Sequence, residues 1–311
     1  MVMAYRGFGV WALVAKQVIE AALDSLQIYL VSRWNPGRPN LSRSVLQAPY
    51  AYGKHIFGAR MLDTFYFRID SFLIGNFIGS AALGYYAVGQ KIYQALFELL
   101  SKIFSNVAIP YMAREKNDRP AVKRIYLQFL QLVSTVSMPA FVCIFIFSHE
   151  LITALFGNKW SESAWILRAF CVLGMVNCVA YFNGHLLMAM GDSKAYFGVE
   201  VKKTAMMAAF CLLGVNFGLP GVVAAVVLVG ALVAPISYGK MRNWIDVGVV
   251  DIARALVNGI SIAVVTGLAV VSIKLLLVQY PGIGKILLGL LVFVLAMAAL
   301  NFGKIRKKIS I

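Results

Sequence analysis

The sequence predicts an all-α protein, a polytopic bundle of transmembrane helices. Hydrophobic residues occupy 60% of its 311 positions, only 14% of the positions are charged, and the mean hydropathy is +0.78. A soluble domain usually carries about 25% charged residues. A globule of this size cannot hide so much apolar surface from water, so we expect lipid to be part of its solvent.

Apolar stretches divide the chain into about nine spans. A helix needs about 20 apolar residues to cross the hydrocarbon core of a bilayer. We expect the spans at residues 7–32, 53–77, 82–108, 125–147, 164–190, 196–215, 220–238, 253–279 and 283–302. The sixth span differs from the others in composition, because Glu200, Lys202 and Lys203 lie in its first two turns.

Basic residues in the loops predict the orientation of the chain. The loops after the odd-numbered spans, together with the C-terminal tail, hold seventeen Lys and Arg residues, whereas the alternate loops hold three. Basic loops stay on the cytoplasmic side, so we expect a cytoplasmic C-terminus and an N-terminus outside. A chain that begins outside looks like the continuation of a longer protein. The net charge of +16 is spread over these loops rather than gathered on one face, which argues against nucleic acid as a partner.

The cysteines indicate neither a metal site nor redox chemistry. All four lie in apolar runs, with no CxxC pair and no histidine cluster nearby: Cys143, Cys171, Cys178 and Cys211. We expect buried, inert thiols and no cofactor.

Charged residues form stripes on the first three spans. At 100° per residue, the stripes of the first and third spans each cover an arc of about 80°. They consist of Lys16, Glu20, Asp24 and Gln27 on the first span, and Lys91, Gln94, Glu98 and Lys102 on the third. On the second span Asp63 and Asp70 are almost eclipsed, while Arg68 points away from Asp70. Such groups are costly in lipid, so they face either a hydrated interior or ion-pair partners within and between helices.

Glycines follow the second stripe. Gly75 and Gly79 form a GxxxG pattern that allows two membrane helices to approach closely, and Gly84 is expected to permit the turn into the third span. On the fifth span, Asn177 and His185 are expected to form hydrogen bonds between helices rather than to bind a ligand.

Short motifs in a fixed order carry a family resemblance. They are GFGVWAL at residues 7–13, DSFLIG at 70–75, ALGYY at 82–86, Pro110 followed by Arg114, and LFGNKW at 155–160. In this order the chain resembles the polysaccharide flippases of the multidrug/oligosaccharidyl-lipid/polysaccharide exporter superfamily. The similarity covers most of residues 7–245.

The resemblance implies a fold of fourteen helices, in two six-helix lobes followed by two further helices. The nine spans would then be helices six to fourteen, and about five N-terminal helices would be missing, as in a truncated gene product, a misplaced start codon or a fragment. Residues 1–50 would hold the last helix of the first lobe with a cytoplasmic linker, 51–245 the second lobe, and 246–311 the two additional helices.

The resemblance also implies a function, the movement of undecaprenyl-pyrophosphate-linked sugar repeat units from the inner to the outer leaflet of the bacterial inner membrane. The implied partners are this polyprenyl-pyrophosphate-linked sugar lipid, the lipid bilayer and candidate polysaccharide assembly proteins. Candidates for lining the substrate cavity are Lys16, Arg60, Arg68 and Lys91, since cations suit phosphate. Candidates for proton or ion coupling are Asp63, Asp70 and Glu98.

Three other functions fit parts of the sequence. A membrane enzyme acting on sugar lipids would need paired acids in an outer loop, and residues 149–163 offer only Glu150 and Glu162. A drug or cation antiporter of the same superfamily fits poorly with the excess of Lys and Arg over acids within the spans. A non-transporting fragment is the third alternative, because one lobe has nothing to alternate against.

Overall fold

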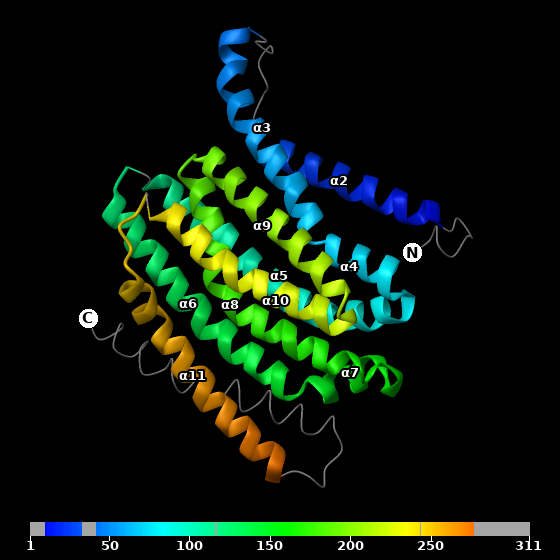
Figure 1. Cartoon of the computed structure of the whole chain (residues 1–311). Helices are drawn as coiled ribbons and strands as arrows, with labels where there is room; N and C mark the ends of the chain where they lie inside the picture. The colour runs from blue at the N-terminus through cyan, green and yellow to red at the C-terminus, as the bar shows by residue number, and fades with distance from the viewer. Residues whose placement is uncertain (1–9, 33–41, 116, 243, 277–311) are drawn as a thin grey trace. The chain divides into compact units, whose positions relative to one another are not determined.

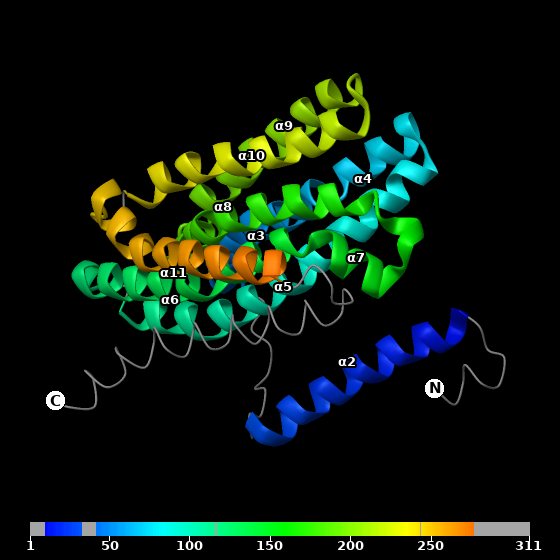
Figure 2. The ribbon, with the colours of Figure 1, turned by 90° about the horizontal axis from the view of Figure 1, so that it is seen from below.

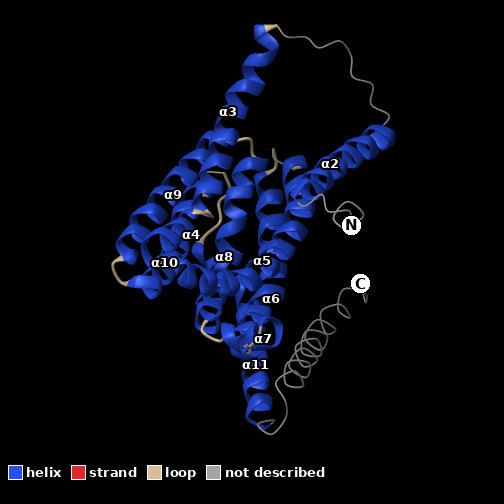
Figure 3. Ribbon diagram, turned by 90° about the vertical axis from the view of Figure 1, so that its right-hand side faces the viewer, coloured by secondary structure: helices blue, strands red, loops and turns tan. Residues whose placement is uncertain are grey.

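The computed structural model describes residues 10–32, 42–115, 117–242 and 244–276. These residues form helices and short connections, with no strand among them, as expected from the composition (Figure 3). Judged by length and composition alone, three of the described helices could cross a membrane: Arg119–Ile146, Gly218–Met241 and Val249–Ser272. The expected ninth span, 283–302, lies outside the described residues, and the count of nine stays a prediction.

The chain divides into two units, Met1–Tyr50 and Ala51–Ile311. The first contains helix α2, Val10–Ser32, and the first turns of helix α3, Arg43–Tyr66. The remainder of α3 and all later helices belong to the second unit. Each unit is described by itself below.

The expected second span is not one continuous helix. Helix α3 ends at Tyr66, Phe67 and Arg68 form a turn, and the chain resumes as α4, Ile69–Leu73, and the π-helical turn η1, Ile74–Ile78. Asp63 and Asp70 therefore do not share one helix, so the helical spacing that made them nearly eclipsed does not apply.

The glycine that turns the chain is Gly79 rather than Gly84. Gly79 has φ of +120°, a conformation that glycine adopts without the steric cost of a side chain, and it separates η1 from α5, Ser80–Arg114. Gly84 lies inside α5, where an added Cβ would be 3.3 Å from the ring of Trp160. The expectation for Gly84 was wrong, because this glycine provides room for a neighbouring ring and not a turn.

The rest of the second unit is a series of antiparallel helices (Figure 1). They are α6, Arg119–Ile146; the short α7, Ser148–Phe156, and η2, Asn158–Trp160; α8, Ser163–Ala189; α9, Ser193–Val215; α10, Gly218–Met241; and α11, Val249–Leu276. Aspartates cap two of the N-termini: Asp118 accepts a hydrogen bond from the Ala121 amide (3.0 Å) and Asp192 from the Ala195 amide (2.9 Å). These bonds satisfy amides that a helix start would otherwise leave without a partner.

Helix α8 is central to this unit, because it packs against α5, α6 and α10. Helix α9 packs on α10 and helix α11 on α6, and both pairs lie side by side in Figures 1 and 2. A buried polar network joins three of the helices. The Tyr126 hydroxyl donates to Asn183 (2.8 Å), whose amide donates to the Ser237 hydroxyl (3.0 Å).

The cysteines are buried where the structure describes their side chains. Cys143, Cys171 and Cys211 are free and buried, in agreement with the expectation of inert thiols. The side chain of Cys178 lies outside the described part of the chain.

Candidate functional site

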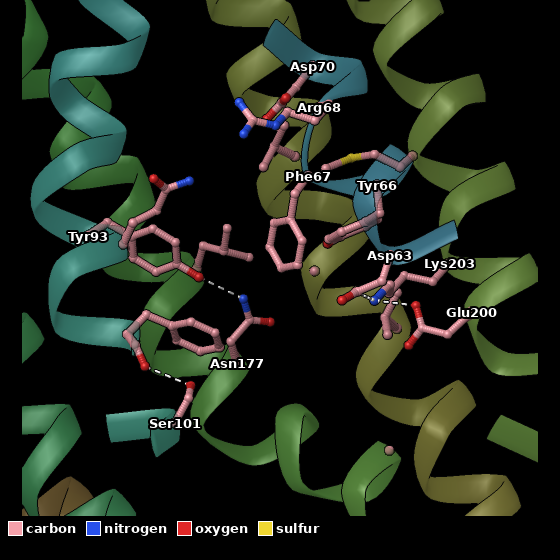
Figure 4. A pocket seen from close by; sticks show the side chains of 18 of the residues that line it. Asp63, Tyr66, Phe67, Arg68, Asp70, Tyr93, Ser101, Asn177, Glu200 and Lys203 are labelled. Atoms are coloured by element: carbon pink, nitrogen blue, oxygen red, sulfur yellow. Dashed lines mark hydrogen bonds and ion pairs between the residues drawn. The ribbon is translucent and has the colours of Figure 1, made fainter. Parts of the chain in front are cut away.

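A cavity of about 510 Å³ lies in the second unit among α3, α4, α5, α8, α9 and α10 (Figure 4). Its wall carries both charged groups and aromatic rings. The charged residues that line it are Arg60, Asp63, Arg68, Asp70, Glu98, Glu200 and Lys203.

Lys203 forms the centre of a charged cluster on one wall. Its ammonium lies 2.9 Å from the Asp63 carboxylate on α3 and 2.5 Å from the Glu200 carboxylate on α9 (Figure 4). The same ammonium stands over the ring of Tyr66, 4.4 Å from its centroid. Glu200 is 5% exposed, so the cluster is largely removed from water. Two helices are thereby joined through one cation.

Arg60 and Arg68 lie on the cavity without a carboxylate of their own. Both side chains are exposed, and neither makes an ion pair with any residue in the described ranges. Asp63, one turn from Arg60, is held instead by Lys203. Because the chain turns at Phe67 and Arg68, the Arg68 guanidinium does not lie on the surface of a continuous helix. It lines the cavity instead (Figure 4). Two cationic groups are therefore available to an anion.

Asp70 is only 2% exposed and takes part in hydrogen bonds rather than in an ion pair. It accepts from the Tyr86 hydroxyl and the Ser71 amide, and more weakly from the Gln90 amide group at 3.5 Å. Tyr86 and Gln90 belong to α5, so Asp70 joins α4 to α5. The expectation that Arg68 and Asp70 do not pair with each other agrees with these contacts.

The polar stripe predicted on the third span lines the cavity only in part. Gln94 and Glu98 on α5 line the cavity, together with Ser101, whereas Lys91 is exposed and is not among the lining residues. Lys91 follows Gln90, which does face the cavity, and one residue along a helix rotates the side chain by 100°.

Lys16 belongs to the first unit, where its ammonium lies 3.5 Å from Glu20 on the same helix. This is the pairing within one helix that the sequence left open as an alternative. Since the cavity lies wholly in the second unit, a shared position of Lys16 with Arg60 and Arg68 stays a prediction.

Aromatic rings from α5 and α8 line another part of the cavity. Tyr93 is stacked between Phe97 and Phe170, with centroid distances of 5.6 and 5.2 Å. The Asn177 amide group donates to the Tyr93 hydroxyl at 3.0 Å, which confirms Asn177 as an interhelical hydrogen bonder between α8 and α5 (Figure 4). The side chain of His185 lies outside the described part of the chain.

Two members of the site, Glu200 and Lys203, were not among the residues that the sequence singled out for it. The signal was present, because three charged residues in the first two turns of an apolar span are costly unless they face a partner. The sequence could not identify that partner, since Asp63 lies 140 positions away.

The comparison with known protein families covers the N-terminal half of the chain. A family model described as polysaccharide biosynthesis protein matches residues 1–165, which is more than half of the chain. This stretch includes Arg60, Asp63, Arg68 and Asp70 of the cavity wall, but not Glu200 or Lys203.

Curated relatives are matched over about half of the chain. The teichuronic acid biosynthesis protein TuaB of Bacillus subtilis is 28% identical over 148 residues, 48% of this chain and 31% of the relative. The lipopolysaccharide biosynthesis protein WzxC of Escherichia coli is 23% identical over 56% of this chain and 36% of its own length. The succinoglycan biosynthesis transport protein ExoT of Rhizobium meliloti is 20% identical over 53% and 33%. The matched part of this chain thus spans about a third of the length of these relatives.

Among solved structures, the chain resembles the lipid II flippase MurJ in its inward closed conformation. The TM-score is 0.58 at 15% sequence identity, and the match covers 81% of this chain and 53% of the other. At this identity the likeness establishes the fold alone.

Proposed function

Because the chain belongs to the polysaccharide biosynthesis protein family, we propose that it moves a lipid-linked oligosaccharide across a bacterial membrane. The substrate class is an undecaprenyl-pyrophosphate-linked repeat unit, carried from the inner to the outer leaflet of the cytoplasmic membrane. The names of the relatives, which include a transport protein and a flippase of similar fold, support transport rather than an enzymatic reaction.

The observation that carries this proposal is the pair of guanidinium groups on the cavity wall. A pyrophosphate cannot enter hydrocarbon without a replacement for its hydration, because the loss of solvation costs many kcal/mol. Arg60 and Arg68 have no carboxylate partner among the described residues, so both guanidinium groups can donate hydrogen bonds to phosphate oxygens. The acids nearest to them in sequence are occupied, Asp63 by Lys203 and Asp70 by hydrogen bonds.

Aromatic rings complement the charged groups of the cavity. The rings of Tyr93, Phe97 and Phe170 are stacked next to the cavity, and flat apolar faces of this kind can pack against the C–H faces of sugar rings. In this proposal the pyrophosphate contacts the arginines, the sugars fill the cavity, and the prenyl chain remains in lipid.

Asp63, Asp70 and Glu98 remain our candidates for proton or ion coupling. Asp70 and Glu98 are the better placed of the three, since neither forms an ion pair with a described residue, whereas Asp63 is joined to Lys203. We also propose the division inferred from the sequence, with residues 51–245 as one lobe that moves against a partner lobe during alternating access.

The test is charge reversal in the bacterium that carries the gene. The gene is deleted and replaced by the wild-type form, by Arg60→Glu or by Arg68→Glu, and surface polysaccharide is measured together with lipid-linked repeat units. We expect either variant to lower surface polysaccharide at least tenfold while lipid-linked units accumulate, because the pyrophosphate would meet a negative group.

The matched control is Arg124→Glu, which reverses an exposed arginine outside the cavity. It should leave surface polysaccharide unchanged, and all proteins should be present in the membrane at equal amounts. Normal polysaccharide in both cavity variants would remove the arginines from the mechanism. Resistance to cationic dyes that depends on the gene would favour a cation exporter instead.

A further inference from the structure

A second, smaller hollow of about 320 Å³ lies between α9 and α10, near the end of the unit where α9 begins and α10 ends. We call it the α9–α10 groove; its walls carry Gly198 and Lys202 from α9 and Pro235, Gly239 and Lys240 from α10. The two helices lie side by side over their length (Figures 1 and 2).

The groove carries two positive charges that no carboxylate balances. Lys202 and Lys240 are exposed, and neither forms an ion pair with a residue in the described ranges. Of the acids near them in sequence, the exposed Asp246 forms no ion pair with either lysine among the described residues, and two others are occupied. Glu200 binds Lys203, and Asp192 caps α9 and accepts a hydrogen bond from the Trp244 indole at 3.0 Å.

Lys202 and Lys240 line the same groove, one from each helix. Lys202 lies nine residues after the start of α9 at Ser193, roughly 14 Å along the axis. Its side chain leans toward the N-terminus of its helix, and its long apolar stem lets the ammonium reach back in that direction. Lys240 is the penultimate residue of the antiparallel α10 and lies at that same end.

Trp244 indicates where this end sits in a bilayer. Its ring is fixed at the start of α9 by the hydrogen bond to Asp192, and tryptophan is enriched at the boundary between headgroups and hydrocarbon. Since the groove lies at the same end of α9 and α10, we expect it to lie near this boundary.

Two glycines keep the groove open. A Cβ built on Gly198 or on Gly239 would meet no atom within 4 Å, so nothing in the described part of the chain fills the space above them. The floor is backbone, proline ring and aliphatic side chain, and the two ammonium groups supply the polar contacts.

We propose that the α9–α10 groove binds one anionic phospholipid, whose phosphodiester lies between Lys202 and Lys240 and whose acyl chains continue along the helices. The lipid would belong to the leaflet that contacts the basic loops. This inference requires a membrane protein but is independent of the transported substrate, so it can fail without affecting the proposed function. Each Lys or Arg side chain near a membrane surface strengthens the binding of anionic lipid to the protein.

The experiment titrates phosphatidylglycerol into the purified full-length chain in a neutral detergent and counts bound lipids by native mass spectrometry. We expect one tightly bound phosphatidylglycerol and no tightly bound phosphatidylcholine. The double variant Lys202→Gln/Lys240→Gln should weaken this binding by about 30-fold, the product of two lysine contributions.

A second variant tests the shape of the site without changing charge. Gly198→Leu places a side chain in the open space, so it should displace the lipid while the protein remains monodisperse with an unchanged melting temperature. The control Lys194→Gln/Arg124→Gln removes the same charge from exposed positions outside the groove and should leave binding unchanged.

Three results would overturn the proposal. Equal losses in the control and in the groove variant would indicate a diffuse basic surface. Undiminished binding in Gly198→Leu would place the lipid elsewhere. Displacement of the lipid by millimolar inorganic phosphate or pyrophosphate would identify a site for a free anion.

Discussion

Lys203 is the residue on which the charged wall of the cavity depends. Its ammonium is shared by two carboxylates from different helices, and its side chain is 13% exposed. Charges removed from water are tolerated when they are paired, but removal of one partner leaves the others without compensation. At this position a single cation stabilises both Asp63 and Glu200.

We predict that Lys203→Met destabilises the protein by about 3 kcal/mol, because two carboxylates would remain close together without a cation. The measurement is thermal unfolding of the purified protein in detergent. Lys194→Met, which removes an exposed lysine of the same helix outside the cavity and the α9–α10 groove, should unfold at the wild-type temperature.

A triple variant separates charge from packing. When Asp63→Asn and Glu200→Gln are added to Lys203→Met, no uncompensated carboxylate remains and most of the lost stability should return. If Lys203→Met alone were as stable as the wild type, the cluster would not be a structural tie between α3 and α9.

At the scale of elements, α11 packs closely on α6 at Gly259. A Cβ on Gly259 would lie 2.7 Å from the backbone of Ser134 on α6, a distance that real side chains do not adopt. The helices can therefore approach this closely only because the position has no side chain.

We predict that Gly259→Ala lowers stability by about 1–3 kcal/mol, since the two helices must separate or distort to admit a methyl group. Gly53→Ala is the matched control on α3, because a Cβ there would meet nothing within 4 Å. It should be neutral or slightly stabilising through its higher helix propensity. Equal melting temperatures for both variants and the wild type would contradict the close approach.

Ion pairs hold α11 at its two ends. Lys123 on α6 lies 2.7 Å from Asp251, and Lys274 lies 2.7 Å from Glu150 on the short helix α7. Lys274 also donates to the carbonyl of Ile146 at 2.8 Å. The helix is thereby fixed along its whole length, with Gly259 between the two pairs.

The Glu150 pair predicts a pH dependence. Burial acts to raise the pKa of the Glu150 carboxyl, but the hydrogen bond and charge of Lys274 outweigh it and hold the pKa below the ordinary value of 4.5. A lowered folded-state pKa contributes stability above pH 4.5 that is lost as the pH falls through the folded value. Melting temperatures between pH 7 and pH 3 should fall more steeply for the wild type than for Glu150→Gln. Parallel curves would show that the pair contributes nothing.

At the scale of the whole molecule, hydropathy predicted the helices well and their interruptions poorly. The expected span 164–190 is displaced by one residue from α8. The C-terminal ends of the expected spans 125–147 and 196–215 lie within one residue of the ends of α6 and α9. Long apolar runs and Asp caps are local signals, so the sequence can reveal them. The break at Phe67 and Arg68 has no Gly or Pro to announce it. It is a tertiary feature that a single sequence does not encode locally.

The candidate site was predicted in part for the same reason. Charged residues in apolar spans identified Arg60, Asp63, Arg68, Asp70 and Glu98, all of which line the cavity. Helical spacing alone could not decide that Lys91 would point elsewhere. It also could not reveal that Lys203 would approach Asp63 from another helix, because long-range pairs are set by packing and not by periodicity.

The orientation of the molecule in the membrane is the last prediction. Helix α6 has 28 residues, about 42 Å of rise, which is more than the roughly 30 Å of a hydrocarbon core. Asn117 precedes this helix among the basic residues of its loop, whereas Asn158 follows α7 beyond the other end. If α6 crosses the bilayer with its basic end inside, these two exposed positions must lie on opposite sides.

Single cysteines at the two positions test this with a thiol reagent that cannot cross the membrane. Asn158→Cys should react in intact cells, and Asn117→Cys only after the cells are opened. Cys178 is replaced by alanine in both variants; the background should then be low, since Cys143, Cys171 and Cys211 are buried and a buried thiol reacts slowly. Reaction of Asn117→Cys in intact cells would reverse the orientation, and reaction of both positions from the same side would mean that α6 does not span the membrane.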